Sequence, residues 1–275
     1  MLRIYLKLLA LQQFTRPQNY KPQLNSNLVT MKRTVLVIVL LLMYTSASAQ
    51  LFSKEKIANQ ENFDKDFLTW GYFLGFNSYD FKFQYNADQA NRPDIGVETT
   101  IGFNVGLVGD MRINEYLNLR FEPGLYITRR NLEYDETMQY DPYFYDNTYN
   151  PGDLFREVKS TYIHFPLLLK VSTKRINNFK PFVVGGVSTA LNLSSNEENP
   201  DDNASGQFRT KTGMLFYELG FGIDFYLEWF KFTPSIRGVF AINDELVKDK
   251  DPQSPWTGNI DKMQTRGVFI NFTFQ

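Results

Sequence analysis

One histidine stands alone in this sequence as a conventional general base, because the chain contains a single His, His164, and no Cys. Hydrolysis at such a residue needs a nucleophile within hydrogen-bond distance of the imidazole. Ser160 lies four residues earlier, which places it on the same face of a strand but about 13 Å along it. Two residues at that spacing cannot form a nucleophile and base pair within one strand. We therefore expect His164 to be a packed side chain, and a catalytic role is the alternative.

Charged side chains on the polar face of alternating segments form a second candidate group. If these segments enclose a narrow barrel, each charge needs a partner, because an unpaired buried charge is strongly unfavourable. We expect a salt-bridge network that closes the lumen, with a conduction path or gate as the alternative. The spacing of the carboxylates singles out no acid and base pair. The expected network residues are Arg120, Glu122, Lys170, Glu218, Asp224 and Arg237.

A segment dense in Tyr and Asp, Tyr134 to Asp153, is the candidate surface for a protein partner. Rigid amphipathic rings suit protein recognition. A solvated loop and loose calcium binding are the alternatives, although the spacing of a calcium-binding loop is missing. The segment from Asp249 to Trp256 has the same ambiguity. The rings proposed for partner contact are Tyr140, Tyr143, Phe144, Tyr145 and Tyr149.

Composition removes several classes of function. The absence of Cys excludes disulfides, thiolate catalysis and Cys-ligated zinc, and one His excludes a His-rich metal site. We expect no catalytic, cofactor-binding or metal-ligating residues, and therefore no enzyme. The net charge is −1, and it falls to −7 when the six basic residues within positions 1–49 are removed with the leader described next. A nucleic-acid binder needs the opposite sign.

The N-terminal region predicts export. From Met31 a charged pair is followed by an apolar run and by Ala47-Ser48-Ala49, which together form a secretory signal peptide over residues 31–49. Residues 1–30 are interpreted as an extension from a mis-set start codon, with an organelle leader as the alternative. We expect residues 50–67 to be a periplasmic N-terminal segment and residues 68–275 to form one β-barrel domain.

Alternation with a period of two dominates the exported chain and predicts strands. The runs are seven to twelve residues long, close to the length of about ten with which a tilted strand crosses a bilayer. No run of eighteen apolar residues exists, so membrane-spanning helices are not expected. The eight runs lie within 70–77, 101–107, 117–128, 163–171, 182–193, 215–225, 230–240 and 268–274.

The connections between runs alternate in length. Short links are predicted at 113–116, 173–178 and 226–229, and long polar ones at 80–98, 129–159, 194–211 and 243–266. Outer-membrane barrels have this arrangement, with short turns in the periplasm and long loops outside. The sequence therefore predicts an all-β, eight-stranded antiparallel transmembrane β-barrel of the outer-membrane type.

Periodicity alone does not say whether the apolar face meets lipid or a cavity, so a secreted lipocalin-like barrel is the alternative. The other face carries glycines such as Gly71, Gly106 and Gly220 beside charged residues. Glycines make room for large side chains in a narrow interior but weaken a water-facing strand. This favours lipid on the outside. Aromatic residues at run ends fit positions at the membrane interfaces, and ordinary strand residues are the alternative for each of them. They are Trp70, Tyr116, Tyr226 and Trp229.

Five segments resemble the PorT family of outer-membrane β-barrels from Bacteroidetes. The resemblance covers essentially all of the exported chain, and the last segment is its most specific part. It implies a role in type IX protein secretion and, in gliding species, in gliding motility, and it transfers no catalytic residue. The segments are Glu115–Leu125, Ser160–Lys170, Phe179–Gly186, Phe232–Phe240 and Asn243–Gln275.

Together these observations predict a non-enzymatic barrel of the cell outer membrane. Its expected partners are outer-membrane lipid, the barrel assembly machinery, which would meet the aromatic-ended strand at Phe274, and other type IX components. No nucleic acid and no cofactor are expected. A structural, adhesin or porin-like barrel is the alternative function. A lipid-modifying enzyme that uses His164 is the less favoured one.

Overall fold

The computed structural model describes residues 59–86, 94–135, 154–203, 208–252 and 254–275. The predicted extension, signal peptide and first part of the N-terminal segment lie outside the described residues. The five aromatic residues proposed for partner contact, Tyr140 to Tyr149, also lie outside them. Within the described residues, no helix is long and apolar enough to cross a membrane.

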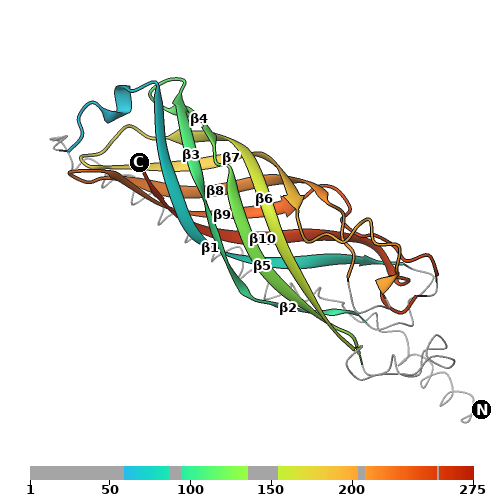
Figure 1. Cartoon of the computed structure of the whole chain (residues 1–275). Coiled ribbons are helices and arrows are strands. Elements are labelled where there is room, and N and C mark those ends of the chain that lie inside the picture. Colours follow the sequence, from blue (N-terminus) through green and yellow to red (C-terminus); the bar gives the residue numbers. More distant parts are fainter. Residues whose placement is uncertain (1–58, 87–93, 136–153, 204–207, 253) are drawn as a thin grey trace, which may run out of the picture. The chain divides into compact units, whose positions relative to one another are not determined.

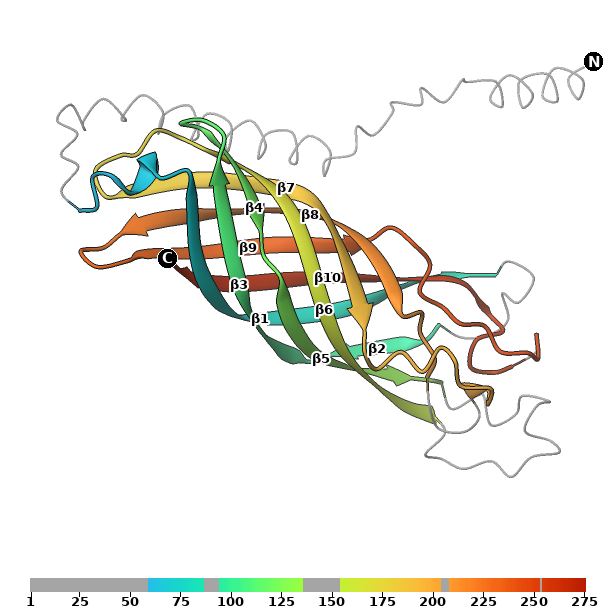
Figure 2. The same cartoon turned by 45° about the horizontal axis from the view of Figure 1, so that its top comes forward.

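Ten strands form one antiparallel sheet that closes on itself (Figures 1 and 2). Closure comes from β1, which pairs with β10 on one side and with β3 on the other. The strands are β1 (Leu68–Tyr85), β2 (Gly96–Thr99), β3 (Ile101–Arg112), β4 (Leu117–Phe121), β5 (Gly124–Glu133), β6 (Phe155–Ser172), β7 (Phe179–Asn192), β8 (Gly213–Tyr226), β9 (Lys231–Ala241) and β10 (Ile260–Phe274).

The ten strands occupy eight positions around the ring, which confirms the predicted eight-stranded barrel. Only Thr100 separates β2 from β3, and Glu122 and Pro123 separate β4 from β5. Both β4 and β5 pair with β6, so they form one interrupted strand. The proline has no backbone N–H to donate to a ladder. Its carbonyl oxygen still accepts a hydrogen bond from the Leu107 N–H at 2.9 Å.

The alternation of the sequence is seen directly in the burial of β8. Leu219 and Phe221 face outward and are 67% and 61% exposed, whereas Glu218, the residue before Leu219, is buried in the lumen. Around the ring, the lower part of the barrel, next to the short turns, has an apolar outer wall. Its inward positions combine charged residues, aromatic residues and glycines. This is the arrangement of a membrane barrel whose outer surface meets lipid.

Strands continue into three of the long connections that the sequence predicted. The expected loops at 80–98, 129–159 and 243–266 are wrong in part, because β1 continues to Tyr85, β5 to Glu133, and β6 and β10 begin at Phe155 and Ile260. In these extensions the two faces exchange character. On β1, Asp80 and Lys82 point outward, and Phe81 is buried inside. Outward polar residues indicate that these parts of the strands lie beyond the lipid. The sequence pattern predicts loops there because it lacks apolar outward positions.

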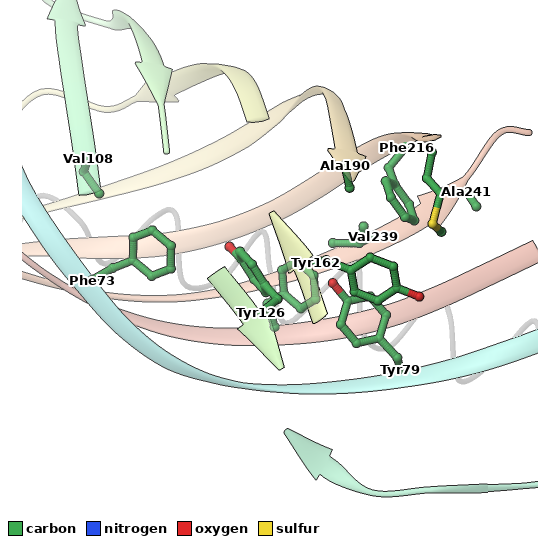
Figure 3. Packing of buried hydrophobic residues seen from close by; sticks show 11 residues of the cluster. Phe73, Tyr79, Val108, Tyr126, Tyr162, Ala190, Phe216, Val239 and Ala241 are labelled. Atoms are coloured by element: carbon green, nitrogen blue, oxygen red, sulfur yellow. The ribbon is translucent and has the colours of Figure 1, made fainter. Parts of the chain in front are cut away.

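Two apolar clusters fill the lumen above the charged residues. The middle cluster is largely aromatic, and Figure 3 shows Phe73, Tyr126, Tyr162 and Phe216 directed toward one another from different strands. A second cluster lies within the strand extensions at the long-loop end. It contains residues from the strands and from the loops, and its members are Phe81, Ile95, Leu132, Tyr134, Val158, Phe208, Leu246, Trp256, Ile260 and Met263.

Candidate functional site

The six charged residues expected in the lumen all lie there, and ion pairs connect them in one chain. In the lower layer, Lys170 Nζ lies 2.6 Å from Asp224 Oδ2 and 3.8 Å from Asp110 Oδ2. The Asp110 carboxylate also pairs with Arg120 at 3.2 Å. Arg120 then lies 3.2 Å from Glu122. Lys170 and Arg120 therefore each contact two carboxylates, and each of these carboxylates comes from a different segment of the ring.

The upper part of the network is centred on Arg237 of β9. Its guanidinium lies 2.7 Å from Glu122 on one side and 2.8 Å from Glu218 on the other. All these side chains are at most 5% exposed. Buried ion pairs of this kind depend on mutual satisfaction, because removal of one member leaves an uncompensated charge. The lumen at this level is filled by paired side chains.

Sequence reasoning missed two buried members of this region. Asp110 is not among the predicted residues because the predicted second run ends at Leu107, although the inward parity of β3 continues to residue 110. Lys231 lies within the predicted run 230–240 but is not among the residues expected in the network. Its ammonium lies 4.6 Å from the centre of the Phe63 ring and interacts electrostatically with Asp224. The charged side chain at Asp110 was the signal that could have extended the run.

His164 lies in the aromatic layer above the charges, on β6. Its Nε2 atom is 2.9 Å from the Tyr79 hydroxyl, and its ring stacks on Phe216 with centroids 5.2 Å apart. The imidazole is fully buried. Ser160 does not meet it: the Ser160 hydroxyl instead accepts a hydrogen bond from Arg130 at 2.8 Å. The geometry needed for a Ser and His pair is therefore not formed between these two residues.

The long-loop end of the lumen is closed by the connection between β9 and β10. Trp256, expected in an external loop, is 2% exposed and packs inside against Tyr134 and Arg156. The side chain of Asp249 is also buried, and its carboxylate accepts hydrogen bonds from Arg209 and Thr257 at 2.9 Å. A purely solvated loop is therefore the wrong description of this segment. It packs inward at Trp256, which is part of the upper core.

Glu245 of the same connection lies above the lipid-facing part of the wall and contacts β10. Its carboxylate accepts hydrogen bonds from the Thr265 N–H at 2.8 Å and the Thr265 hydroxyl at 2.7 Å. Arg130 donates to that same hydroxyl at 2.8 Å. Burial raises the pKa of the Glu245 carboxyl to about 7, against the opposing effect of the Arg130 charge. The segment therefore contains a carboxyl that titrates near neutral pH.

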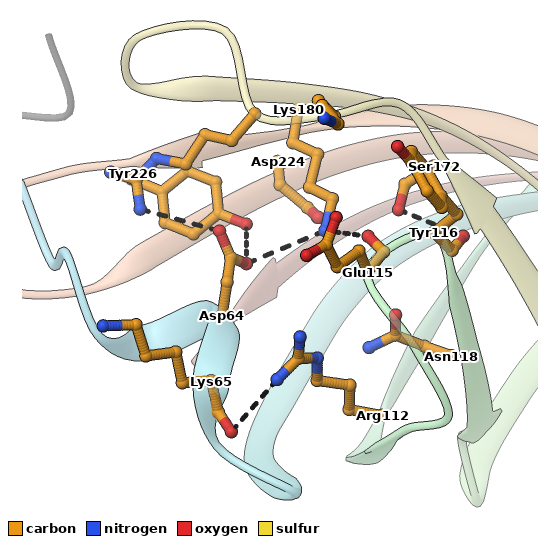
Figure 4. Close-up of polar contacts among 12 residues, drawn as sticks. Asp64, Lys65, Arg112, Glu115, Tyr116, Asn118, Ser172, Lys180, Asp224 and Tyr226 are labelled. Carbon is orange, nitrogen blue, oxygen red and sulfur yellow. Dashed lines mark hydrogen bonds and ion pairs between the residues drawn. The ribbon is translucent and has the colours of Figure 1, made fainter. Parts of the chain in front are cut away.

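The short-turn end is covered by residues 59–67, which include the 3-10 helix η2 (Phe63–Lys65) (Figure 4). The Asp64 carboxylate accepts a hydrogen bond from the Tyr226 hydroxyl and lies 3.7 Å from Arg175 and 3.8 Å from Lys180. Tyr226 is thus buried beneath this N-terminal segment, and its expected place at the membrane interface is wrong. Trp70 and Trp229, in contrast, are 68% and 85% exposed on the outer wall.

Arg175, in the turn between β6 and β7, holds the N-terminal segment by its backbone. Its guanidinium donates to the carbonyl oxygens of Asn59 and Gln60 and lies 3.7 Å from the centre of the Tyr226 ring. Lys174 beside it is exposed. No group of three or more His, Cys, Asp or Glu residues arranged to hold a metal ion occurs within the part of the chain that the structure describes.

A closed antiparallel ring with an apolar outer wall and a charged, filled lumen defines a small outer-membrane β-barrel. The model of the family described as outer membrane protein beta-barrel domain matches residues 49–247, and the chain belongs to this family. The protein is located in the outer membrane. In barrels of this class, short turns lie in the periplasm and long loops outside. The N-terminal segment therefore covers the periplasmic mouth.

Solved structures of other outer-membrane barrels are similar but distant. OprG from Pseudomonas aeruginosa is 16% identical, with 75% of this chain and 93% of that chain covered and a TM-score of 0.40. Ail of Yersinia pestis, in complex with the heparin analogue sucrose octasulfate, is 13% identical, with 74% and 96% covered and a TM-score of 0.33. These likenesses carry no argument about function. No curated protein matches the chain.

Proposed function

We propose that this protein is a non-enzymatic outer-membrane component of the type IX secretion pathway, and of gliding motility in species that glide. The sequence resemblance to the PorT family supports the pathway. The observation that carries the mechanism is the Glu122–Arg237–Glu218 chain across the lumen. A passage lined by paired, buried charges has no room for a folded cargo. Cargo therefore crosses the membrane elsewhere, and this barrel acts through its two surfaces.

The periplasmic surface offers a defined place for such contacts. The turn between β6 and β7 presents exposed Lys174, while its neighbour Arg175 fixes the N-terminal segment. The external partner surface, centred on Tyr140 to Tyr149, stays a prediction. Other type IX components are the proposed partners on these surfaces, together with outer-membrane lipid on the wall and the barrel assembly machinery during insertion.

A deletion strain of the native organism tests this function. Type IX cargo should remain inside the cells and reappear in the medium when the wild-type gene is restored. Lys174→Glu, or a shortened 136–151 segment, should reduce export while heat-modifiable migration on gels still reports a folded barrel. His164→Ala should export normally if it folds, whereas an enzyme would lose its function.

Two results would contradict the proposal. Normal export by the deletion strain would favour a structural or adhesin role. Normal export by all surface variants, with export stopped by Arg237→Gln in a folded barrel, would favour a gated, porin-like lumen. Single-channel conductance of the purified barrel would distinguish a gated lumen from a filled one, because a filled lumen should pass no steady current.

A further inference from the structure

A groove of about 570 Å³ lies on the outer wall, over β3, β5 and β6. It is found where the strand of β2 and β3 is interrupted at Thr100, whose hydroxyl donates to the carbonyl oxygen of Arg129. The groove belongs to neither the lumen nor the periplasmic mouth. It lies at the level where the outer face changes from apolar to polar.

The lower part of the groove is apolar and faces lipid. Ile101 is 81% exposed, and Phe103 and Ile127 beside it are each nearly half exposed. Side chains of this kind on the wall of a membrane barrel contact acyl chains. A hollow in such a wall, rather than a flat surface, holds a chain on more than one side and so increases the apolar area removed from water.

The upper part of the groove is lined by two cations. Arg129 and Lys159 each lie 2.9 Å from the carboxylate of Glu157, so the three side chains carry a net charge of +1. Both cations remain more than half exposed. Exposed ion pairs contribute little stability, so the two cations can exchange or share this carboxylate. Glu98, the other carboxylate of the adjoining strand, accepts a hydrogen bond from Asn131.

Long loops mark this end of the barrel as the outer one, so the groove lies in the outer leaflet. The lipid of that leaflet with both a phosphate and closely packed acyl chains is lipopolysaccharide. We propose that the groove binds the lipid A part of one lipopolysaccharide molecule. A glucosamine phosphate contacts Arg129 and Lys159, and an acyl chain lies along Ile101, Phe103 and Ile127. Arginine and lysine are the side chains that form strong charge-assisted bonds to phosphate.

Native mass spectrometry of the full-length barrel, released from detergent after titration with lipid A, tests the site. The wild type should retain one lipid A molecule in preference to phosphatidylglycerol. The double variant R129E/K159E should bind lipid A at least about tenfold more weakly, because two charge-assisted contacts become repulsive. The double variant K65E/K174E makes the same change in charge at the periplasmic end and should bind as the wild type does.

Removal of both phosphates from lipid A separates the two halves of the proposal. The wild type should bind dephosphorylated lipid A weakly, about as weakly as R129E/K159E binds intact lipid A. R129E/K159E should bind dephosphorylated lipid A no more weakly than the wild type does. Ile127→Asn should weaken both lipids. Heat-modifiable migration verifies that each variant is folded. Equal binding of phosphatidylglycerol and lipid A, or unchanged binding by the folded R129E/K159E variant, would overturn the assignment.

Discussion

The Tyr226 hydroxyl donates a hydrogen bond to the Asp64 carboxylate, although 162 residues separate the two in sequence. Tyr226 ends β8, and Asp64 lies in η2 before the first barrel strand (Figure 4). The Phe63 ring meets the same tyrosine edge-on, with centroids 6.2 Å apart. These contacts join the N-terminal segment to the far side of the ring, so the periplasmic mouth is covered by a part of the chain that contributes no barrel strand.

Arg175→Ala should release this cover. The variant loses the guanidinium bonds to the carbonyl oxygens of Asn59 and Gln60 and the stacking on Tyr226. We expect the amides of residues 59–67 to exchange hydrogen at least about tenfold faster, as expected for a loss of about 1.4 kcal/mol in local stability. Hydrogen exchange in detergent micelles measures this. Lys174→Ala should leave the rates unchanged, and equal rates in both variants would contradict the role of Arg175.

The lumen network should be sensitive to the loss of its shared cation. Arg237→Met leaves Glu122 and Glu218 buried without the guanidinium that pairs them. We expect the free energy of unfolding to fall by about 3–5 kcal/mol. Urea unfolding in lipid vesicles, followed by gel mobility, measures it. The triple variant E122Q/E218Q/R237M removes all three charges together and should recover most of the loss; a triple variant as unstable as R237M would argue against the pairing.

The lipid-facing wall should reject charge. Leu167 and Phe221 are about half and nearly two-thirds exposed on that wall. Arg at either position should cost roughly 2–4 kcal/mol of barrel stability near the middle of the bilayer. Arg at Gln84, an exposed outward position on the extended part of β1 outside the lipid, adds the same charge as a matched control and should change stability little. If Arg at Leu167 and at Phe221 changes stability as little as Arg in the control does, the two faces of the lower barrel have been assigned in reverse.

Glu245 predicts a pH dependence of the external closure. Its pKa is raised to about 7 in the folded protein by burial, with Arg130 opposing and Asp244 reinforcing the shift. A raised carboxyl pKa means that the folded state holds the proton longer than the unfolded state does. The closure therefore has its full stability below about pH 4.5. Its stability falls by about 3 kcal/mol as the pH rises to about 7 and does not change at higher pH.

The measurement compares the opening of residues 242–252 at pH 5 and pH 8, by fluorescence from a probe on a cysteine introduced at Lys248. Wild type should open more at pH 8. Glu245→Gln keeps a side chain of the same shape without the titration and should remove the difference between the two pH values. A pH effect of the same size in the Gln variant would assign it to another group.

The sequence predicted the ring of strands because lipid imposes a strict rule: every second residue of a spanning strand must be apolar. This rule correctly placed Leu219 and Phe221 outside and Glu218 inside. It also placed the three short turns, since polar residues interrupt the pattern there. What it could not provide was pairing between strands. Arg237 contacts both Glu122 and Glu218 because of the register between strands around the ring. Residues far apart in sequence determine that register.

The same rule failed above the membrane. A rule that expects apolar residues at outward strand positions assigns Asp80, Lys159 and Arg266 to loops. In the structure they lie on strands that extend into water. Trp256 and Tyr226 were misplaced for a related reason, because an aromatic ring in a connection can either face the lipid interface or fill the lumen. Their burial is decided by partners from elsewhere in the chain, Tyr134 and Arg156 for one and Asp64 for the other.

Because the two faces of β1 exchange character, the outer surface of the barrel meets lipid along its lower part and water along its upper part. Below Ser78 the strand is built for hydrocarbon outside, and above it for water outside, with Phe81 in an interior like that of a soluble protein. The upper core can pack only after its strands and loops have crossed the bilayer. Trp256→Ser should therefore slow the last step of assembly into vesicles without slowing insertion. Once formed, a core of this size on the far side opposes withdrawal of the strands, so insertion becomes one-directional.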